Sequence, residues 1–172
     1  RGYRRGERFI LLDIDDSATL IAVRRPQGSD VDVDLRPVTG TPPRSDRLAL
    51  LGRFGDRVIY TSDADIARRV CDSRMAAFVD SIPPMVDLLW SEGPWTLGTI
   101  AYESGAPQWD AAIETVARLS GLLRVLPPSA GMAEAARSAD AALGSPADHG
   151  HDRQFGHVAP SLRGPADGTP ER

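Results

Sequence analysis

A row of three aspartates offers the most direct chemistry in the sequence. Asp30, Asp32 and Asp34 alternate with apolar residues, so a strand over 30–35 would carry all three carboxylates on one face, about 7 Å apart. Asp13 and Asp15 lie in a neighbouring predicted hairpin, and Ca²⁺ or Mg²⁺ binds several carboxylate oxygens. These residues predict either a divalent-cation site or the solvated outer face of a sheet. A straight strand splays its carboxylates apart, which favours the solvated face.

The three histidines of the chain, His149, His151 and His157, form a loose cluster near its end that could bind a transition metal. Few apolar residues surround them, so incidental surface histidines are the favoured interpretation. The region predicted to fold contains no histidine. Histidine-based triads and histidine–metal catalysis therefore have no base or ligand in that region.

Cys71, the single cysteine, lies between two predicted short helices and close to several arginines. Neighbouring cations can lower the pKa of a thiol and make it reactive, but buried cysteines at helix junctions are more common. We therefore favour a packing role. One cysteine also excludes an internal disulfide framework and a cysteine zinc cage.

Trp90, Trp95 and Trp109 fall within twenty positions and could line an aromatic pocket. Their spacing also suits a packed core, which we favour. The sequence contains no P-loop, no glycine fingerprint for a dinucleotide and no Gly-x-Ser-x-Gly elbow. We therefore predict no catalytic residues and no cofactor, and a binding or scaffolding module.

Composition sets the class of protein. The 172 residues are 41% hydrophobic, enough for one domain with a core plus additional chain. The formal net charge of -4 gives no sign of a nucleic-acid surface. All 20 basic residues are arginine, which is typical of a GC-rich genome and indicates a bacterial source.

The first eight residues are the basic part of the chain. Arg1, Arg4, Arg5 and Arg8 outweigh Glu7, which gives this segment a net charge of +3. Cytoplasmic segments beside membrane helices carry excess arginine or lysine, which anionic lipids attract. We therefore expect residues 1–8 to be a juxtamembrane linker at the inner face of the plasma membrane. Because the chain begins at Arg1 and not at Met, we also expect an upstream anchor.

The elements that must position these residues are strands and helices in a single domain over 9–128. Apolar runs predict a hairpin over 9–23, with its turn at 15–17, and strands at 30–35 and 57–60. A turn is predicted at 26–29. A second hairpin over 86–100 is predicted to turn at 91–94 and to pair Leu88 with Leu97.

Three helices are predicted to pack on one face of these strands. Ser62 followed by Asp65 predicts the start of one short helix, and Asp72 the start of a second. Pro107 opens a long helix whose apolar stripe, including Ile113, is expected to face Leu88 across the hairpin.

The composition changes after Pro128. Residues 132–143 are alanine-rich and predict a weak helix. From Ser145 the chain has few apolar residues, so we predict that the 129–172 tail is mostly disordered.

The order of the segments over 52–128 carries a resemblance. A strand led by Arg-Phe-Gly-Asp at 53–56 precedes a helix opened at 62–65, then a helix with Met75, a hairpin with Trp90 and a helix with Asp110. This order resembles an uncharacterised group of bacterial membrane-anchored proteins with a cytoplasmic α+β domain. The resemblance implies that architecture and a membrane address, and it carries no activity.

The sequence thus predicts an α+β fold with an antiparallel β-meander, two short helices and one long helix. The expected function is non-enzymatic binding or scaffolding, with a protein partner, a membrane surface contacted through the N-terminal arginines, and no nucleic acid. The alternative is a soluble carboxylate-based enzyme or divalent-metal-binding protein that uses residues 13–34.

Overall fold

The structure, a computed structural model, describes residues 1–14, 17–101 and 104–144. It is an α+β fold built on one antiparallel sheet of six strands, which confirms the predicted fold class. The strands are β1 (Gly2–Arg4), β2 (Glu7–Ile14), β3 (Ala18–Pro37), β4 (Ala49–Phe54), β5 (Arg57–Thr61) and β6 (Val86–Ala101). The helices are α1 (Ala64–Ala67), α2 (Ser73–Val79), α3 (Ala106–Leu122), a 3-10 turn (Leu123–Val125) and α4 (Ala130–Gly144).

The long strand β3 organises the sheet. Its first half pairs with β2, in a register that sets Ile10 opposite Ala22, and its last residues pair with β5. Along its other edge β3 pairs with β6 from Ala18 to Leu35. The predicted strands at 9–14, 19–23, 30–35 and 57–60 are all present, whereas β1 and β4 carry no clear period and were not predicted.

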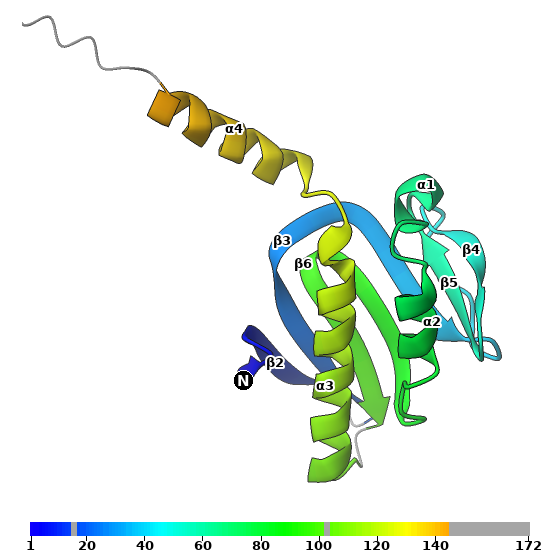
Figure 1. Ribbon diagram of the computed structural model, residues 1–172. Coiled ribbons are helices and arrows are strands. Elements are labelled where there is room, and N and C mark those ends of the chain that lie inside the picture. The colour runs from blue at the N-terminus through cyan, green and yellow to red at the C-terminus, as the bar shows by residue number, and fades with distance from the viewer. Residues whose placement is uncertain (15–16, 102–103, 145–172) are drawn as a thin grey trace, which may run out of the picture.

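β3 arches through the segment that was predicted to be a turn. Residues 26–29 lie within one continuous strand, and the pairing with β6 shifts register between Arg24 and Ser29 and again between Ser29 and Val33. Figure 1 shows β3 rising, bending over and descending toward β5. The predicted tight turn is replaced by a wider bend within the strand, and β3 pairs with β6 on both sides of that bend, at Arg24 and again at Ser29.

β6 doubles back inside the arch of β3, as Figure 1 shows. The predicted reversal at 91–94 is present, although the whole of Val86–Ala101 forms one strand. The Leu88 amide donates a hydrogen bond to Thr99 Oγ1 at 3.2 Å, so the two halves of β6 lie side by side. The predicted partner of Leu88 was Leu97, so the observed contact, with Thr99, lies two residues further along the strand.

The face of β6 that meets the helices is the opposite of the predicted one. Leu89 and Ile100 are fully buried, whereas Leu88 is only half-buried. At Gly98, an added Cβ would lie 2.7 Å from Val116 Cγ2 of α3, so the absent side chain permits this close approach. The expected contact between Leu88 and Ile113 is therefore wrong, although Ile113 itself is buried.

The short helices begin at aspartate caps. The Asp72 side chain accepts hydrogen bonds from the first turn of α2, as predicted. At α1 the cap is Asp63 and not Ser62, because Asp63 Oδ1 accepts from the amides of Asp65 and Ile66 at 3.0 Å. The Ser62 hydroxyl instead accepts from the Asp32 amide at 2.9 Å, which ties α1 to β3.

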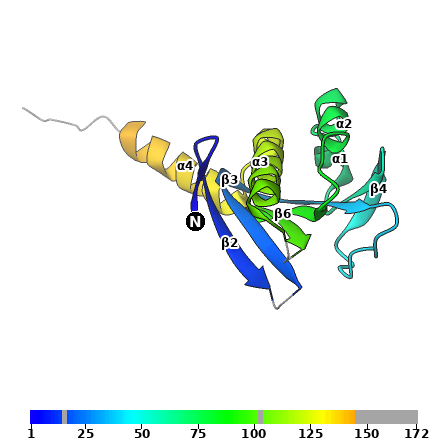
Figure 2. The same ribbon diagram turned by 90° about the horizontal axis from the view of Figure 1, so that it is seen from below.

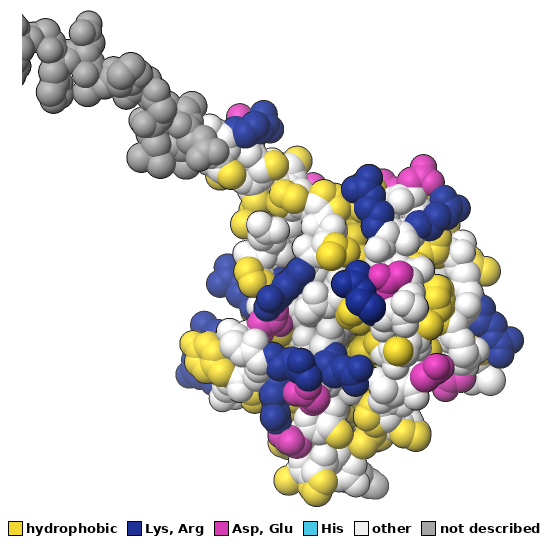
Figure 3. Space-filling view, in the orientation of Figure 1, with side chains coloured by type: hydrophobic (Ala, Val, Ile, Leu, Met, Phe, Trp, Pro, Cys, Tyr) yellow, Lys and Arg dark blue, Asp and Glu magenta, His cyan; other side chains and the backbone are white. Residues whose placement is uncertain are grey.

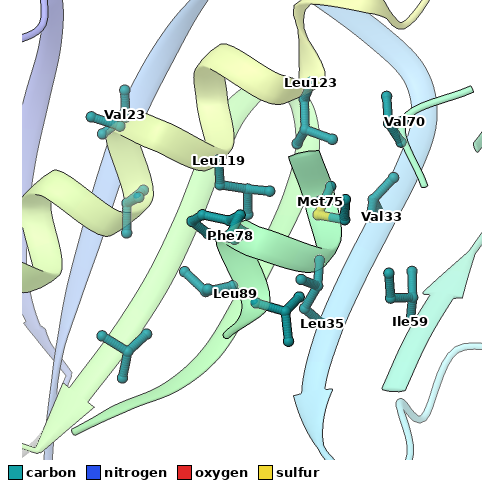
Figure 4. Close-up of a cluster of buried hydrophobic side chains, with 14 of the residues drawn as sticks. Val23, Val33, Leu35, Ile59, Val70, Met75, Phe78, Leu89, Leu119 and Leu123 are labelled. Atoms are coloured by element: carbon teal, nitrogen blue, oxygen red, sulfur yellow. The ribbon is translucent and has the colours of Figure 1, made fainter. Parts of the chain in front are cut away.

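The core lies between one face of the sheet and helices α1 to α3. Figure 4 shows Leu119 and Leu123 of the α3 region above Leu89 and Phe78, with Val33 nearby from β3. Figure 2 shows these helices on one side of the sheet and no helix on the other side. The helices thus pack on one face of the sheet, as predicted, and no described helix covers the opposite face.

Candidate functional site

We call the sheet face opposite α1 to α3 the open face. Among the described residues no helix covers it. The registers of β2, β3 and β6 set apolar side chains beside one another there: Leu12, Leu20 and Thr99 in one row, and Ile10, Ala22 and Leu97 in the next. Leu12 is 50% exposed. A contiguous apolar surface of this kind on a soluble domain commonly marks a binding site.

An apolar groove of about 520 Å³ runs along the open face. Its walls come from β2, β3 and the reversal of β6: Ile10, Leu12, Leu20, Ala22, Glu92, Gly93, Pro94, Trp95 and Leu97. Gly93 takes a positive φ of 51°, which a glycine adopts without strain at the reversal. The groove therefore depends on the arched shape of β6.

A smaller polar pocket of about 220 Å³ is lined by the descending half of β3, the loop before β4, and β6. Its lining residues are Asp32, Val33, Asp34, Ser45, Arg47, Leu48, Trp90, Ser91 and Glu92. Glu92 also lines the apolar groove, so the two hollows adjoin. The open face thus combines the apolar groove with the polar pocket, which contains carboxylates, the Arg47 guanidinium and the Trp90 indole.

The carboxylates of the polar pocket differ in their electrostatic setting. Asp34 is buried and accepts hydrogen bonds from the Arg36 guanidinium at 2.8 and 2.9 Å. Burial raises the pKa of Asp32 above its ordinary value, while the nearby charge of Arg47 acts in the opposite direction. One of the two carboxylates is therefore held as an ion pair, and the other carries an electrostatic cost.

The structure separates the aspartates that were predicted to share a face. Asp32 and Asp34 line the polar pocket, whereas Asp30 Oδ2 accepts a hydrogen bond at 2.8 Å from the Ala130 amide, where α4 begins. Asp13 accepts from the Thr19 hydroxyl at 3.0 Å, and Asp15 lies outside the described residues. Within the described part of the chain, no three His, Cys, Asp or Glu side chains are placed to hold a metal ion.

The tryptophans divide between core and surface. Trp109 packs against the core, as favoured from the sequence. Trp90 lines the polar pocket and Trp95 the apolar groove, and both are half-buried. Cys71 is half-buried against the core, and burial raises the pKa of its thiol, which disfavours the reactive thiolate. The three histidines lie outside the described residues.

A third hollow, of about 600 Å³, lies on the helical side between α2 and α3. Four arginines line it: Arg5, Arg74, Arg118 and Arg124. Figure 3 shows basic side chains gathered over these two helices. Sequence patterns did not reveal this cluster, because its members come from an N-terminal turn, α2, α3 and the 3-10 turn.

The four N-terminal arginines fall into two groups, paired and exposed. Arg4 forms an ion pair with Asp110, and Arg5 forms one with Glu114, both on α3. Arg1 and Arg8 are exposed. A juxtamembrane role for residues 1–8 stays a prediction. Across the described residues, no helix has both the length and the apolar character needed to cross a membrane.

Comparisons with known proteins identify the family. The family model of the trehalose monomycolate transport factor TtfA matches residues 1–172. Trehalose monomycolate transport factor A of Mycolicibacterium smegmatis (strain ATCC 700084 / mc(2)155) is 42% identical over 127 residues, which are 74% of this chain and 46% of that protein. The chain thus spans about half the length of this relative.

A solved structure agrees with this match. The crystal structure of mycobacterial trehalose monomycolate transport factor A has a TM-score of 0.71 and 42% identity, and the match covers 74% of this chain and 71% of that one. The resemblance found in the sequence implied a bacterial group without an activity, whereas the matched family is named for a transport role. The chain belongs to the family of the trehalose monomycolate transport factor TtfA.

Proposed function

We propose that this chain is a non-enzymatic binding module in trehalose monomycolate transport, and that the open face is its binding surface. The family of the chain supports the transport role. The observation that carries the assignment of the surface is the apolar groove, which adjoins a polar pocket on a sheet face without helical cover in the described residues.

The arginine-lined hollow between α2 and α3 is a weaker candidate for this surface. Three of its arginines already meet carboxylates: Arg5 pairs with Glu114, Arg74 with Asp72 and Arg124 with Glu7. The fourth, Arg118, donates to the Ser81 hydroxyl and lies over the Phe78 ring. Each of the four guanidinium groups thus already has a partner within the fold.

The proposal includes a protein partner and an address at the inner face of the plasma membrane. The cargo named for the relatives is a lipid, which supports a site of action at a membrane. Exposed Arg1 and Arg8 are suited to contact anionic headgroups, at about 1 kcal/mol per arginine near such a surface. The match covers only 46% of the relative, so a partner of that whole protein is assigned to this chain only as part of the proposal.

A chimaera tests this proposal. The segment of this chain that matches 127 residues of the Mycolicibacterium smegmatis factor replaces its counterpart in that protein, in cells depleted of their own copy. We expect the chimaera to restore delivery of labelled trehalose monomycolate to the cell surface. A chimaera that accumulates to normal levels and restores nothing would refute the transport role.

Matched substitutions in the chimaera test the surface. Leu12→Asp places a charge in the apolar groove and should reduce delivery. Val125→Asp changes a side chain of similar exposure, 47% against 50%, outside the groove, and should leave delivery unchanged. Equal behaviour of the two variants would contradict the assignment of the open face.

A further inference from the structure

The groove and the pocket of the open face are neighbours of opposite character. They share Glu92, but only the pocket adds further charged side chains, those of Asp32, Asp34 and Arg47, to its serine, aliphatic and Trp90 lining, whereas the rest of the groove is apolar. We propose that the open face binds one molecule of a neutral glycolipid, with one sugar ring in the polar pocket of about 220 Å³ and its acyl chain along the apolar groove. This inference rests on the proposed function and names the ligand of the same surface.

The apolar groove suits an acyl chain. At about 520 Å³ it falls within the range of ligand-binding hollows, roughly 300–1,000 Å³. Its floor comes from the paired rows of β2, β3 and β6, which are held together by the hydrogen bonds of the sheet. Burial of each methylene of a chain in such a groove contributes about 0.8 kcal/mol.

The polar pocket suits a neutral sugar better than an anionic headgroup. Asp32, Asp34 and Glu92 supply carboxylate oxygens, which accept hydrogen bonds from hydroxyl groups and repel a phosphate or carboxylate. Arg47 supplies donors for the sugar oxygens, and the Trp90 indole offers a flat apolar surface with a polar edge. A polyol has both donors and acceptors in close array, which matches this mixture.

The position of Asp34 adds a constraint on the orientation of the ligand. Its two oxygens accept hydrogen bonds from Arg36, so the carboxylate is fixed, and each oxygen keeps a further lone pair that can accept a hydrogen bond. Asp32, whose ionised form is disfavoured by burial, gains when a hydroxyl donor reaches it. Sugar hydroxyls thus offset a cost that the unliganded pocket carries.

Calorimetric titration of the full chain tests the inference with four defined probes, each below its micellar concentration. Trehalose monodecanoate contains both parts of the ligand, trehalose and decanoate contain one part each, and decyl phosphate replaces the sugar by an anion. We expect saturable binding of one monodecanoate per chain. Each of the other probes should bind at least about tenfold more weakly, because each lacks one set of contacts.

Substitutions then separate the two parts. Leu12→Asp should weaken binding of the monodecanoate and of decanoate alike, whereas Trp90→Ala should weaken the monodecanoate by about tenfold and leave decanoate unchanged. Val125→Asp should change neither, and circular dichroism confirms that each variant is folded. The inference is overturned if decanoate or decyl phosphate equals the monodecanoate, or if Trp90→Ala has no effect.

Two further outcomes distinguish this inference from the proposed function. If no lipid binds while Leu12→Asp still blocks delivery in the chimaera, the face binds a protein and only the glycolipid inference fails. If the chain dimerises and Leu12→Asp makes it monomeric, a second copy covers the face and the glycolipid inference fails as well. If the monodecanoate binds as expected but the unsubstituted chimaera restores no delivery, the transport role fails while the binding site stands.

Discussion

Three aspartates spaced two residues apart have three different roles. Asp30 accepts a hydrogen bond at the start of α4, Asp32 lies in the polar pocket under an electrostatic cost, and Asp34 is locked to Arg36. Residue type and spacing predicted one shared solvated face. The bend of β3 changes the setting of each side chain, so equal spacing does not give equal environments.

The pKa of Asp32 predicts a pH effect on stability. Burial raises this pKa above the ordinary value of 3.8, so the folded protein keeps the proton in a window where the unfolded chain has lost it. Stability contributed by this group therefore falls as the pH rises through that window and stays lower above it. We expect Asp32→Asn to be more stable than the parent at pH 7, with the difference vanishing in acid.

Urea unfolding of Asp32→Asn and of the parent across the acid range measures this difference. Asp13→Asn is the matched control, because Asp13 is exposed and its carboxylate accepts a hydrogen bond from the Thr19 hydroxyl. A variant that loses stability at pH 7 would show that the Asp32 carboxylate is stabilised, not strained, in the fold.

The cap of α1 gives a second residue-scale prediction. Asp63→Ala removes the acceptor of two amide hydrogen bonds and should lower the free energy of unfolding by about 1 kcal/mol. Asp65→Ala removes only an exposed ion pair with Arg68 and should cost less than about 0.5 kcal/mol. Thermal unfolding of the two variants compares them, and equal losses would reassign the cap.

At the scale of elements, β6 shows why a correct period can lead to the wrong face. Leu88 and Leu89 are adjacent, so both alternating sets of this strand are apolar, and the pattern alone cannot say which set α3 covers. Gly98 determines which face α3 covers, because Val116 of α3 can approach β6 this closely only at a residue without a side chain. The reversal at 91–94, the strand alternation at 30–35 and the long helix were predictable because each has one dominant period or a proline.

The contact at Gly98 predicts a steric effect. In Gly98→Ala the new Cβ would meet Val116 Cγ2 at 2.7 Å and Leu89 Cδ2 at 2.9 Å, so we expect a loss of about 1–3 kcal/mol in stability. Val116→Ala in the same chain should recover part of this loss. Gly52→Ala, where no atom lies within 4 Å, is the control. Denaturant unfolding of the parent, the two single variants, the double variant and the Gly52→Ala control measures the coupling, and additive losses would exclude the contact.

The choice of face predicts a contrast between neighbouring leucines. Leu89 is fully buried, so Leu89→Ala should cost about 2–5 kcal/mol. Leu88 is half-buried on the open side of β6, so Leu88→Ala should cost clearly less. The same unfolding measurement decides between them. A larger loss of stability in Leu88→Ala than in Leu89→Ala would support the original prediction that the Leu88 face of β6 packs against α3.

At the scale of the whole molecule, the two ends of the domain are fastened together. β1 pairs with β2, Arg4 and Arg5 pair with acidic residues of α3, and Arg124 donates to buried Glu7 at 2.6 Å. The sequence could not show this, because each of the three arginine contacts joins residues more than a hundred positions apart and residues 1–8 have no hydrophobic period. The same distance in sequence hid the groove and pocket of the open face.

Removal of residues 1–8 should therefore destabilise the domain. The deletion removes β1 and the buried Glu7, and leaves Arg124 without its carboxylate, so we expect a loss of more than about 1 kcal/mol. Arg1→Gln with Arg8→Gln retains these contacts and should leave stability within about 0.5 kcal/mol. Urea midpoints compare the two proteins, and an unchanged midpoint in the deletion would make the segment structurally dispensable.

The nested arches of β3 and β6 also bear on how the chain is made. During synthesis β3, which ends at Pro37, leaves the ribosome well before β6 begins at Val86, so one whole edge of its arch has no partner for that interval. Pairing across such a distance in sequence is slow, and unpaired apolar strands aggregate readily. We therefore expect the first strands of the nascent chain to be prone to aggregation until β6 has emerged.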